Sequence, residues 1–236
     1  MSRSPFKLQN VAAEIEAKYS GIKTKIVEVD FAKEDPSKYV PHLEDSLKEV
    51  DVGVLVNNVG LSYDYPNEFL NLESSAIDDI INVNITSLNV MTRILLKPMV
   101  ERKNGAIINV SSLSGIMVSP LLAIYSGAKS YNDYFTQALN KEYASHGITF
   151  QCVMPGPVVS NMSKIRKPSL MVPTPETFVR SALARLGVDE RTSGYWFHDL
   201  MNLAIDTLPR SVMAKVIYGQ SQSIKKRALK KMEKQK

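Results

Sequence analysis

Apolar and polar residues alternate along the chain in blocks whose period switches between that of strands and that of helices. The short, nearly apolar blocks predict strands at Lys23–Val29, Val52–Val56, Ala106–Val110 and Ile148–Val153. Longer blocks with helical spacing predict helices from Pro5 to about Tyr19, Pro36 to Val50, Ser74 to Val100, Ile124 to Ser145 and Pro175 to Leu186. This alternation predicts an α/β fold with a parallel sheet covered by helices on both faces.

Two regions depart from the alternation. Residues 155–175 form a long loop rich in proline, serine and methionine, which indicates a lid over a binding site. Residues 195–218 mix aromatic and aliphatic side chains with charged ones. They predict either an amphipathic helix pair lying on a membrane or a helix packed on its own core, and we favour the packed helix because amphipathicity is the ordinary signature of a surface helix.

Composition and charge exclude several classes of protein. With 236 residues, 44% of them hydrophobic and 22% charged, the chain has the size and balance of one folded domain, which we place at residues 1–224. The net charge of +5 is concentrated in the last twelve residues, 225–236, which carry +6. The remainder sums to −1, so we expect a basic tail and no nucleic-acid partner.

The sequence also disfavours three further classes of protein: disulfide-stabilised, zinc-binding and membrane-spanning ones. Cys152 is the single cysteine, so an intrachain disulfide is impossible and a structural zinc site is not expected. No apolar window is long enough to cross a membrane. The three histidines have no companion residues at metal-ligand or nucleophile spacing, so we interpret them as surface or core residues: His42, His146 and His198.

Polar residues follow four of the predicted strands, where ligands bind in parallel sheets. They are Asp30, the run NNVG at 57–60, Ser111 with Ser112, and the run PGPVVS at 155–160. Any one of these sites alone is explained by the general preference of Asn, Asp, Gly, Pro and Ser for turns.

A tyrosine and a lysine four residues apart supply a tunable acid. Tyr125 and Lys129 share a helix face, so the ammonium can favour ionisation of the phenol. Tyr19 and Lys23 repeat the spacing, but at a helix end. The Tyr125 pair differs because Ser112 stands thirteen residues upstream at a strand end, and it can therefore join a site.

Taken in order, NNVG, Asn84 in NVNITS, Ser112 in INVSS, YSGAK and PGPVVS resemble the short-chain dehydrogenases/reductases. Residues 164–170, 173–179 and 191–201 resemble the branch that holds the very-long-chain 3-oxoacyl-CoA reductases, also called 17β-hydroxysteroid dehydrogenases of type 12. The resemblance implies a Rossmann-like, doubly wound parallel sheet. It also implies NADPH-dependent reduction of a lipid ketone, either 3-oxoacyl-CoA in very-long-chain fatty acid elongation or a 17-ketosteroid.

The resemblance also assigns catalytic roles. Tyr125 would donate a proton to the carbonyl oxygen, and Ser112 would hydrogen-bond the same oxygen. Lys129 would lower the pKa of Tyr125 and hold the nicotinamide ribose. Asn84 would anchor a water that links Lys129 to solvent.

Further residues are expected to hold NADP(H). Asn58 and Gly60 would line the adenine side, and Asp30 would cap the adenine. Arg3 matches a basic position that pairs with the 2′-phosphate, which favours NADPH. The nicotinamide end would be faced by Pro155, Val158 and Ser160, together with Tyr125 and Lys129.

The chain departs from the family pattern at its front. The family's first strand and glycine-rich turn should precede Arg3, yet no glycine occurs before Gly21. We therefore expect an N-terminally truncated sheet that lacks two strands between Lys23–Val29 and Val52–Val56. Either those two strands pair directly, or the chain is a truncated product of a longer protein. A further hypothesis is that the chain is an inactive fragment or isoform that cannot hold the cofactor.

Partners and location are likewise implied by resemblance. Relatives act at the endoplasmic reticulum membrane with the catalytic body on the cytosolic face, so we expect only peripheral membrane contact for this chain. A homodimer would form through the long helices that start near Ser74 and Ile124. The apolar run Leu113–Ile124 suits an acyl chain or a steroid, and equally an ordinary core segment.

Overall fold

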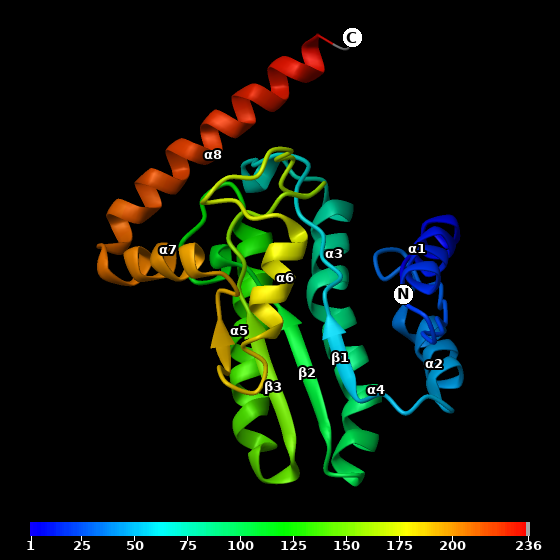
Figure 1. Cartoon of the computed structure of the whole chain (residues 1–236). Coiled ribbons are helices and arrows are strands. Elements are labelled where there is room, and N and C mark those ends of the chain that lie inside the picture. The colour runs from blue at the N-terminus through cyan, green and yellow to red at the C-terminus, as the bar shows by residue number, and fades with distance from the viewer. Residues whose placement is uncertain (235–236) are drawn as a thin grey trace. The chain divides into compact units, whose positions relative to one another are not determined.

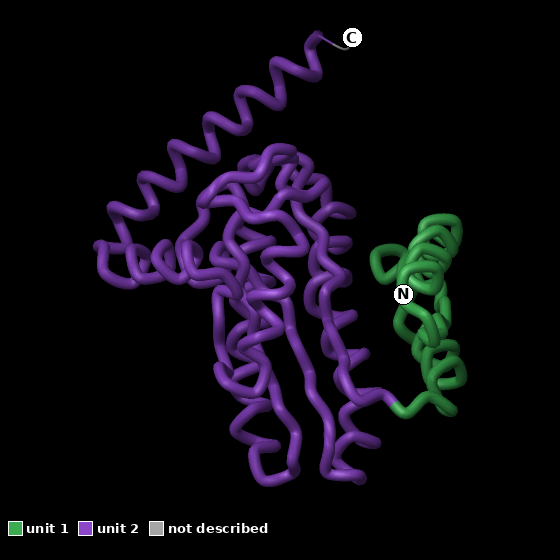
Figure 2. The backbone as a smooth tube through the Cα atoms, viewed as in Figure 1, with its two compact units in different colours: residues 1–51 green, residues 52–236 purple. Residues whose placement is uncertain are grey.

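The computed structural model describes residues 1–234, which form two compact units. Unit 1 is residues 1–51 and unit 2 begins at Val52, as the two colours of Figure 2 show. The expected single domain over residues 1–224 stays a prediction, because the compactness of two units does not measure whether they fold together.

Unit 1 contains two helices, both of which begin at an Xaa–Pro pair. α1 (Pro5–Lys18) starts directly after Ser4, and α2 (Pro36–Leu47) starts after Asp35. The Asp35 carboxylate accepts the backbone N–H of Ser37 at 2.8 Å. Proline suits the first helical position because it lacks the N–H that would be unpaired there, so the helix starts predicted from sequence are confirmed.

The strand predicted at Lys23–Val29 is wrong. The segment makes one isolated parallel bridge, between Glu28 and Ser2, and the Val29 N–H donates to the Ser2 carbonyl at 3.2 Å. Its apolar alternation fits a strand, but a strand exists only through a ladder of hydrogen bonds to its neighbours. Direct pairing with the Val52–Val56 strand would need a strand here, so that alternative is not found in residues 1–234.

Unit 2 is built on a parallel sheet of four strands in the order β1-β2-β3-β4. The strands are β1 (Val54–Asn57), β2 (Gly105–Val110), β3 (Ile148–Val153) and β4 (Arg191–Thr192). The register sets Val56 opposite Ile108 and Ile108 opposite Gln151. The first three strands confirm the prediction, whereas β4 has two residues and so gives no periodic signal.

Helices cover both faces of this sheet, which confirms the doubly wound α/β class (Figure 1). α4 packs on β1 and β2, and α5 packs on β2 and β3. On the opposite face Phe178 and Ala182 of α6 pack against Ile108 and Val153. The bounds are α3 (Ser74–Ile81), α4 (Ser87–Glu101), α5 (Ala123–Glu142) and α6 (Pro175–Leu183), with 3₁₀ turns at Phe69–Asn71, Leu113–Gly115 and Ala144–His146.

The single helix expected over Ser74–Val100 is interrupted. α3 and α4 are joined by a π-helical turn at Asn82–Thr86 that contains Asn84. Such turns inside α-helices are often found at functional sites. Hydrophobic spacing did not reveal it, because one wider turn barely alters the apolar period.

The C-terminal part forms α7 (Trp196–Thr207) and α8 (Arg210–Glu233). Met201 and Ile205 of α7 pack against the core beside Cys152, as the packed-helix interpretation expects. α8 runs past the loops at one end of the sheet (Figure 1), where Lys225 donates to the Asn67 side chain at 2.8 Å. It includes residues 225–233 of the predicted basic tail, whereas residues 235–236 lie outside the described chain. Among residues 1–234 no helix has the length and apolarity to cross a membrane.

Candidate active site

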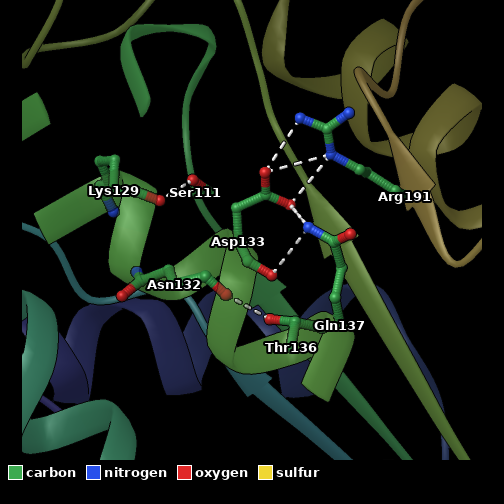
Figure 3. Close-up of polar contacts among 7 residues, drawn as sticks. All are labelled: Ser111, Lys129, Asn132, Asp133, Thr136, Gln137 and Arg191. Carbon is green, nitrogen blue, oxygen red and sulfur yellow. Dashed lines mark hydrogen bonds and ion pairs between the residues drawn. The ribbon is translucent and has the colours of Figure 1, made fainter. Parts of the chain in front are cut away.

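The loops after β1, β2 and β3 lie at one end of the parallel sheet, and the start of α5 lies beside them. The Ser111 hydroxyl, directly after β2, donates to the Lys129 carbonyl of α5 at 2.5 Å (Figure 3). The Lys129 ammonium donates to the carbonyl of Val110 at 2.9 Å. Two hydrogen bonds therefore tie the helix segment that carries Tyr125 and Lys129 to the end of β2.

Tyr125 and Lys129 face one another as their spacing predicts. The Lys129 nitrogen lies 5.8 Å from the centroid of the Tyr125 ring. Lys129 is buried, with 4% of its surface exposed, and this burial lowers its pKa to about 8. Because burial disfavours the charged form of Lys129, its ammonium can release a proton near neutral pH.

The pKa of Tyr125 is raised, which is the opposite of the expected direction. Burial of the phenol raises it, and a hydrogen bond with the Ser112 side chain opposes the shift. The sequence argument weighed the charge of Lys129 but not the loss of solvent around the phenol, and burial of both groups dominates. The same hydrogen bond places Ser112 next to Tyr125, as expected.

Ser112 is held by its own turn. Its hydroxyl oxygen accepts the Ser114 N–H at 3.1 Å and the Ser114 hydroxyl at 2.9 Å. The next residue, Leu113, donates its N–H to the carbonyl of Pro155 at 3.0 Å. The loops after β2 and β3 are therefore joined directly beside Ser112.

Asn84 lies in the π turn with almost no exposed surface. Its amide nitrogen donates to the carbonyls of Leu61 and Ile80, each at 2.8 Å, whereas its Oδ1 has no hydrogen-bond partner. A Cβ placed on Gly60 would lie 3.4 Å from that oxygen and 3.5 Å from the Lys129 nitrogen. Gly60, Asn84 and Lys129 thus converge on one spot.

This spot fits a bound polar group such as part of a nicotinamide cofactor. A buried amide oxygen without a partner is rare in folded proteins, and a bare glycine Cα permits close approach. The buried ammonium of Lys129 supplies a donor at the same place. The residues present are therefore compatible with the NADP(H) expected from sequence.

Several supporting residues on α5 were missed by the sequence argument. Asn132, oriented by its surroundings, donates its amide to the carbonyls of Asn84 at 3.0 Å and Ala128 at 3.1 Å. The Thr136 hydroxyl donates to the Asn132 carbonyl at 2.5 Å (Figure 3). Asn132 and Thr136 stand three and seven residues after Lys129, so the helical period places them on the same core-facing side.

A second polar set links the strands, and of its members the sequence argument had singled out only Asn57, in the run NNVG. The Asn57 amide donates to Asn109 at 2.8 Å, and the Asn109 amide donates to the Thr136 hydroxyl at 2.9 Å. All three side chains are buried. Asparagines inside the apolar blocks of β1 and β2 were the available signal, because buried amides must find partners.

An ion pair fixes the far side of α5. Arg191 of β4 donates to both oxygens of Asp133 at 2.9 to 3.1 Å, and Gln137 donates to Asp133 at 3.0 Å (Figure 3). The Asp133 side chain is 3% exposed. The network anchors the middle of the helix whose first turns carry Tyr125 and Lys129.

The remaining expected residues lie in loops. Val158 accepts the Ser163 hydroxyl through its carbonyl at 2.7 Å, and the exposed Ser160 accepts the Ser163 N–H at 3.1 Å. Pro155 lies beside the Ser112 loop, as described, and Asn58 is exposed. The roles assigned to these residues stay predictions.

Arg3 and Asp30 belong to unit 1 and so to a different compact unit from the residues above. Both lie just beyond the Ser2–Glu28 bridge, on the two segments that it joins. The Asp30 carboxylate accepts the Ala32 N–H at 3.0 Å, which is a turn contact.

Comparison with known proteins gives consistent matches. The family described as short chain dehydrogenase matches residues 1–169. The chain is 43% identical to the very-long-chain 3-oxoacyl-CoA reductase of Homo sapiens, over 99% of this chain and 74% of that protein. It is 42% identical to the very-long-chain 3-oxoacyl-CoA reductase-B of Danio rerio, over 99% and 75% respectively.

Solved structures share the fold. A 7β-hydroxysteroid dehydrogenase superposes with a TM-score of 0.79 at 22% identity, over 92% of this chain and 84% of its own. A short-chain dehydrogenase from Sphingobium yanoikuyae in complex with NADPH gives 0.70 at 22% identity, over 95% and 83%. At these identities the likeness extends to the fold alone.

Proposed function

Because this chain belongs to the short-chain dehydrogenase/reductase family, we propose that it reduces the ketone of a 3-oxoacyl-CoA in very-long-chain fatty acid elongation, with NADPH as cofactor. The observation that carries the proposal is the grouping of Ser112, Tyr125 and the buried Lys129 beside the end of β2. The names of the relatives support an acyl-CoA as substrate.

Reduction needs a hydride at the carbonyl carbon and a proton at the carbonyl oxygen. Bound NADPH supplies the hydride. The Tyr125 hydroxyl donates the proton, and the Ser112 hydroxyl donates a hydrogen bond to the same oxygen. Donors fixed before the reaction stabilise the negative charge as it develops on oxygen, and this is usually the largest catalytic effect in such sites.

Lys129 and Asn84 complete the proton transfer. Burial keeps the Tyr125 phenol protonated until the ketone oxygen gains charge, and the Lys129 ammonium 5.8 Å from the ring centroid then stabilises the phenolate. With a pKa of about 8, Lys129 can pass a proton toward Tyr125 near neutral pH. The unpaired Asn84 Oδ1 is placed to anchor a water that returns the proton to Lys129.

Further residues would hold the cofactor. Gly60 and Asn58 would line the adenine side, Asp30 would cap the adenine, and Arg3 would pair with the 2′-phosphate. The roles of Asp30 and Arg3 are supported by the positions of both residues just beyond the Ser2–Glu28 bridge. Pro155, Val158 and Ser160 would face the nicotinamide end. Replacing Arg3 with alanine should raise the KM for NADPH and leave that for NADH unchanged.

The substrate is tested by following NADPH oxidation with 3-oxoacyl-CoA of increasing chain length and with a 17-ketosteroid. We expect reduction of the long-chain 3-oxoacyl-CoA with a higher kcat/KM than the steroid, and a large loss in Ser112→Ala. Preference for the steroid would contradict the acyl-CoA proposal. No reduction of either ketone by the folded chain would favour the inactive-fragment alternative.

We further propose a homodimer through α4 and α5. A groove of about 590 Å³ between these helices is lined by apolar and aromatic side chains, among them Leu96, Val100, Phe135 and Leu139, together with polar and charged ones such as Arg93, Lys97 and Glu101. Sedimentation should show a dimer that Phe135→Glu dissociates. A monomer at all concentrations would contradict this.

We also propose peripheral contact with the cytosolic face of the endoplasmic reticulum membrane. Residues 226–231 near the end of α8 carry four basic side chains, which attract acidic lipid headgroups. Vesicles containing phosphatidylserine should sediment the protein at low salt and release it at high salt. Equal binding to neutral vesicles would contradict the electrostatic contact.

A further inference from the structure

His198, in the first turn of α7, holds the loop after β3 at two points. Its Nδ1 accepts the backbone N–H of Gly156 at 3.2 Å, and its Nε2 lies 3.3 Å from the carbonyl oxygen of Met171. The side chain has no exposed surface. These two contacts join the beginning and the end of a stretch of sixteen residues that runs from Gly156 to Met171.

The two hydrogen bonds define the protonation state of the ring. A neutral imidazole has one donor and one acceptor nitrogen, so Nδ1 accepts from Gly156 and Nε2 carries the proton that it donates to Met171. Burial lowers the pKa of His198, whereas the carbonyls of Met171, Pro157 and Ser193 and the charge of Asp199 act in the other direction. The neutral ring matches both partners.

The His198 ring is closely packed between the loop and two aromatic side chains. A Cβ on Gly156 would lie 2.7 Å from Cδ2 of His198, so the ring packs directly on the bare backbone. The ring centroid lies 5.3 Å from that of Tyr195 and 6.0 Å from that of Phe178. Two aromatic neighbours therefore pack against the imidazole, and one of them, Tyr195, also donates its hydroxyl to the Leu170 carbonyl of the loop at 3.3 Å.

The contact leads directly to the active site. Gly156 follows Pro155, whose carbonyl accepts the N–H of Leu113 at 3.0 Å, and Leu113 follows Ser112. His198 is therefore separated from the Ser112 loop by two residues and two hydrogen bonds. A shift of Gly156 would move the proposed nicotinamide-side residues and Ser112 together.

We propose that His198 is a positioning residue, whose hydrogen bonds to Gly156 and Met171 set the loop after β3 in the place that cofactor binding requires. The inference rests on the proposed function, since it gives this loop a cofactor to hold. His198 does not itself meet the reacting atoms.

Three variants separate the two hydrogen bonds. In His198→Asn the side-chain oxygen can take the place of Nδ1, in His198→Gln the amide nitrogen can take the place of Nε2, and His198→Leu keeps neither. His42→Leu, at an exposed position on α2, is the matched control. Far-UV circular dichroism identifies the variants that fold.

Two measurements are made on the whole chain. The first is hydrogen exchange at the Gly156 amide, which should stay slow in His198→Asn and become about tenfold faster or more in His198→Gln and His198→Leu. The second is the steady-state kinetics of ketone reduction. The KM for NADPH should rise about tenfold in His198→Leu, with a smaller change in kcat, and His198→Asn should recover most of the loss.

The outcomes distinguish the two proposals. If His198→Asn and His198→Leu fold and behave alike in both measurements, the ring only fills space and the positioning role is wrong. If the wild-type chain reduces no ketone, the proposed function fails. In that case exchange at Gly156 alone decides whether His198 holds the loop.

Discussion

The ammonium of Lys129 lies 5.8 Å from the centroid of the Tyr125 ring while donating a hydrogen bond to the Val110 carbonyl at 2.9 Å. The same burial that brings the two groups together lowers the pKa of Lys129 to about 8 and raises that of Tyr125. A charge held in such a place costs stability. In the proposed function, the chain keeps this destabilising residue because the reaction requires a cation there.

Replacing Lys129 with methionine should therefore stabilise the fold at pH 7 while abolishing reduction. We expect a gain in the free energy of unfolding of roughly 1–3 kcal/mol, because the apolar side chain removes a buried charge. Urea unfolding of both proteins at several pH values measures it.

The pH dependence of that gain has a definite sign. Between pH of about 8 and 10.5, the unfolded wild type holds a proton that the folded wild type has released, so wild-type stability rises with pH relative to the variant. The advantage of Lys129→Met should be full below pH 8 and shrink toward pH 10.5. An advantage that grows with pH would contradict the assignment.

Arg191→Met should destabilise the protein. It leaves the Asp133 carboxylate, 3% exposed, without its cation, and we expect a loss of about 1–3 kcal/mol because only the carboxylate of the pair is buried and the Arg191 side chain is 37% exposed. The double variant Asp133→Asn, Arg191→Met should regain much of the loss because no buried charge remains. Thermal unfolding of the wild type, Asp133→Asn, Arg191→Met and the double variant tests this, and a double variant whose loss equals the sum of the two single losses would refute it.

Two glycines near the site should respond in opposite ways to alanine. A Cβ on Gly115 would lie 2.7 Å from the backbone carbon of Lys129, so Gly115→Ala must push the Ser112 turn off α5. We expect a loss of about 1–3 kcal/mol together with a lower kcat.

Gly127, inside α5, serves as the matched case, because a Cβ added there would meet no atom within 4 Å. Gly127→Ala should stabilise the helix by about 0.5–1 kcal/mol, because alanine loses less backbone entropy on folding. Equal effects of the two substitutions on the free energy of unfolding would show that the close approach at Gly115 does not affect stability.

The sequence predicted those parts of the fold in which local pattern and tertiary context agree. The apolar blocks of β1, β2 and β3, and the Xaa–Pro starts of α1 and α2, each satisfy the local requirement of the element they form. Lys23–Val29 failed because a strand depends on a partner ladder that hydropathy does not encode.

The candidate site was predicted less completely. Ser112, Tyr125 and Lys129 could be placed together because strand ends and helical spacing are readable from sequence. The direction of the Tyr125 pKa could not be predicted, since burial emerges only from packing. The roles of Asn132 and His198 depend on partners 48 and 42 residues distant, at Asn84 and Gly156, which no local pattern relates.

The central claim is that Tyr125 donates the proton that completes ketone reduction. It is tested most directly by comparing wild type and Tyr125→Phe in NADPH-dependent reduction of a long-chain 3-oxoacyl-CoA, with NADPH binding measured in parallel by calorimetry. The account predicts a loss in kcat of about 100- to 10,000-fold with NADPH affinity unchanged, because phenylalanine removes the proton donor. Reduction by Tyr125→Phe at the wild-type rate would contradict it.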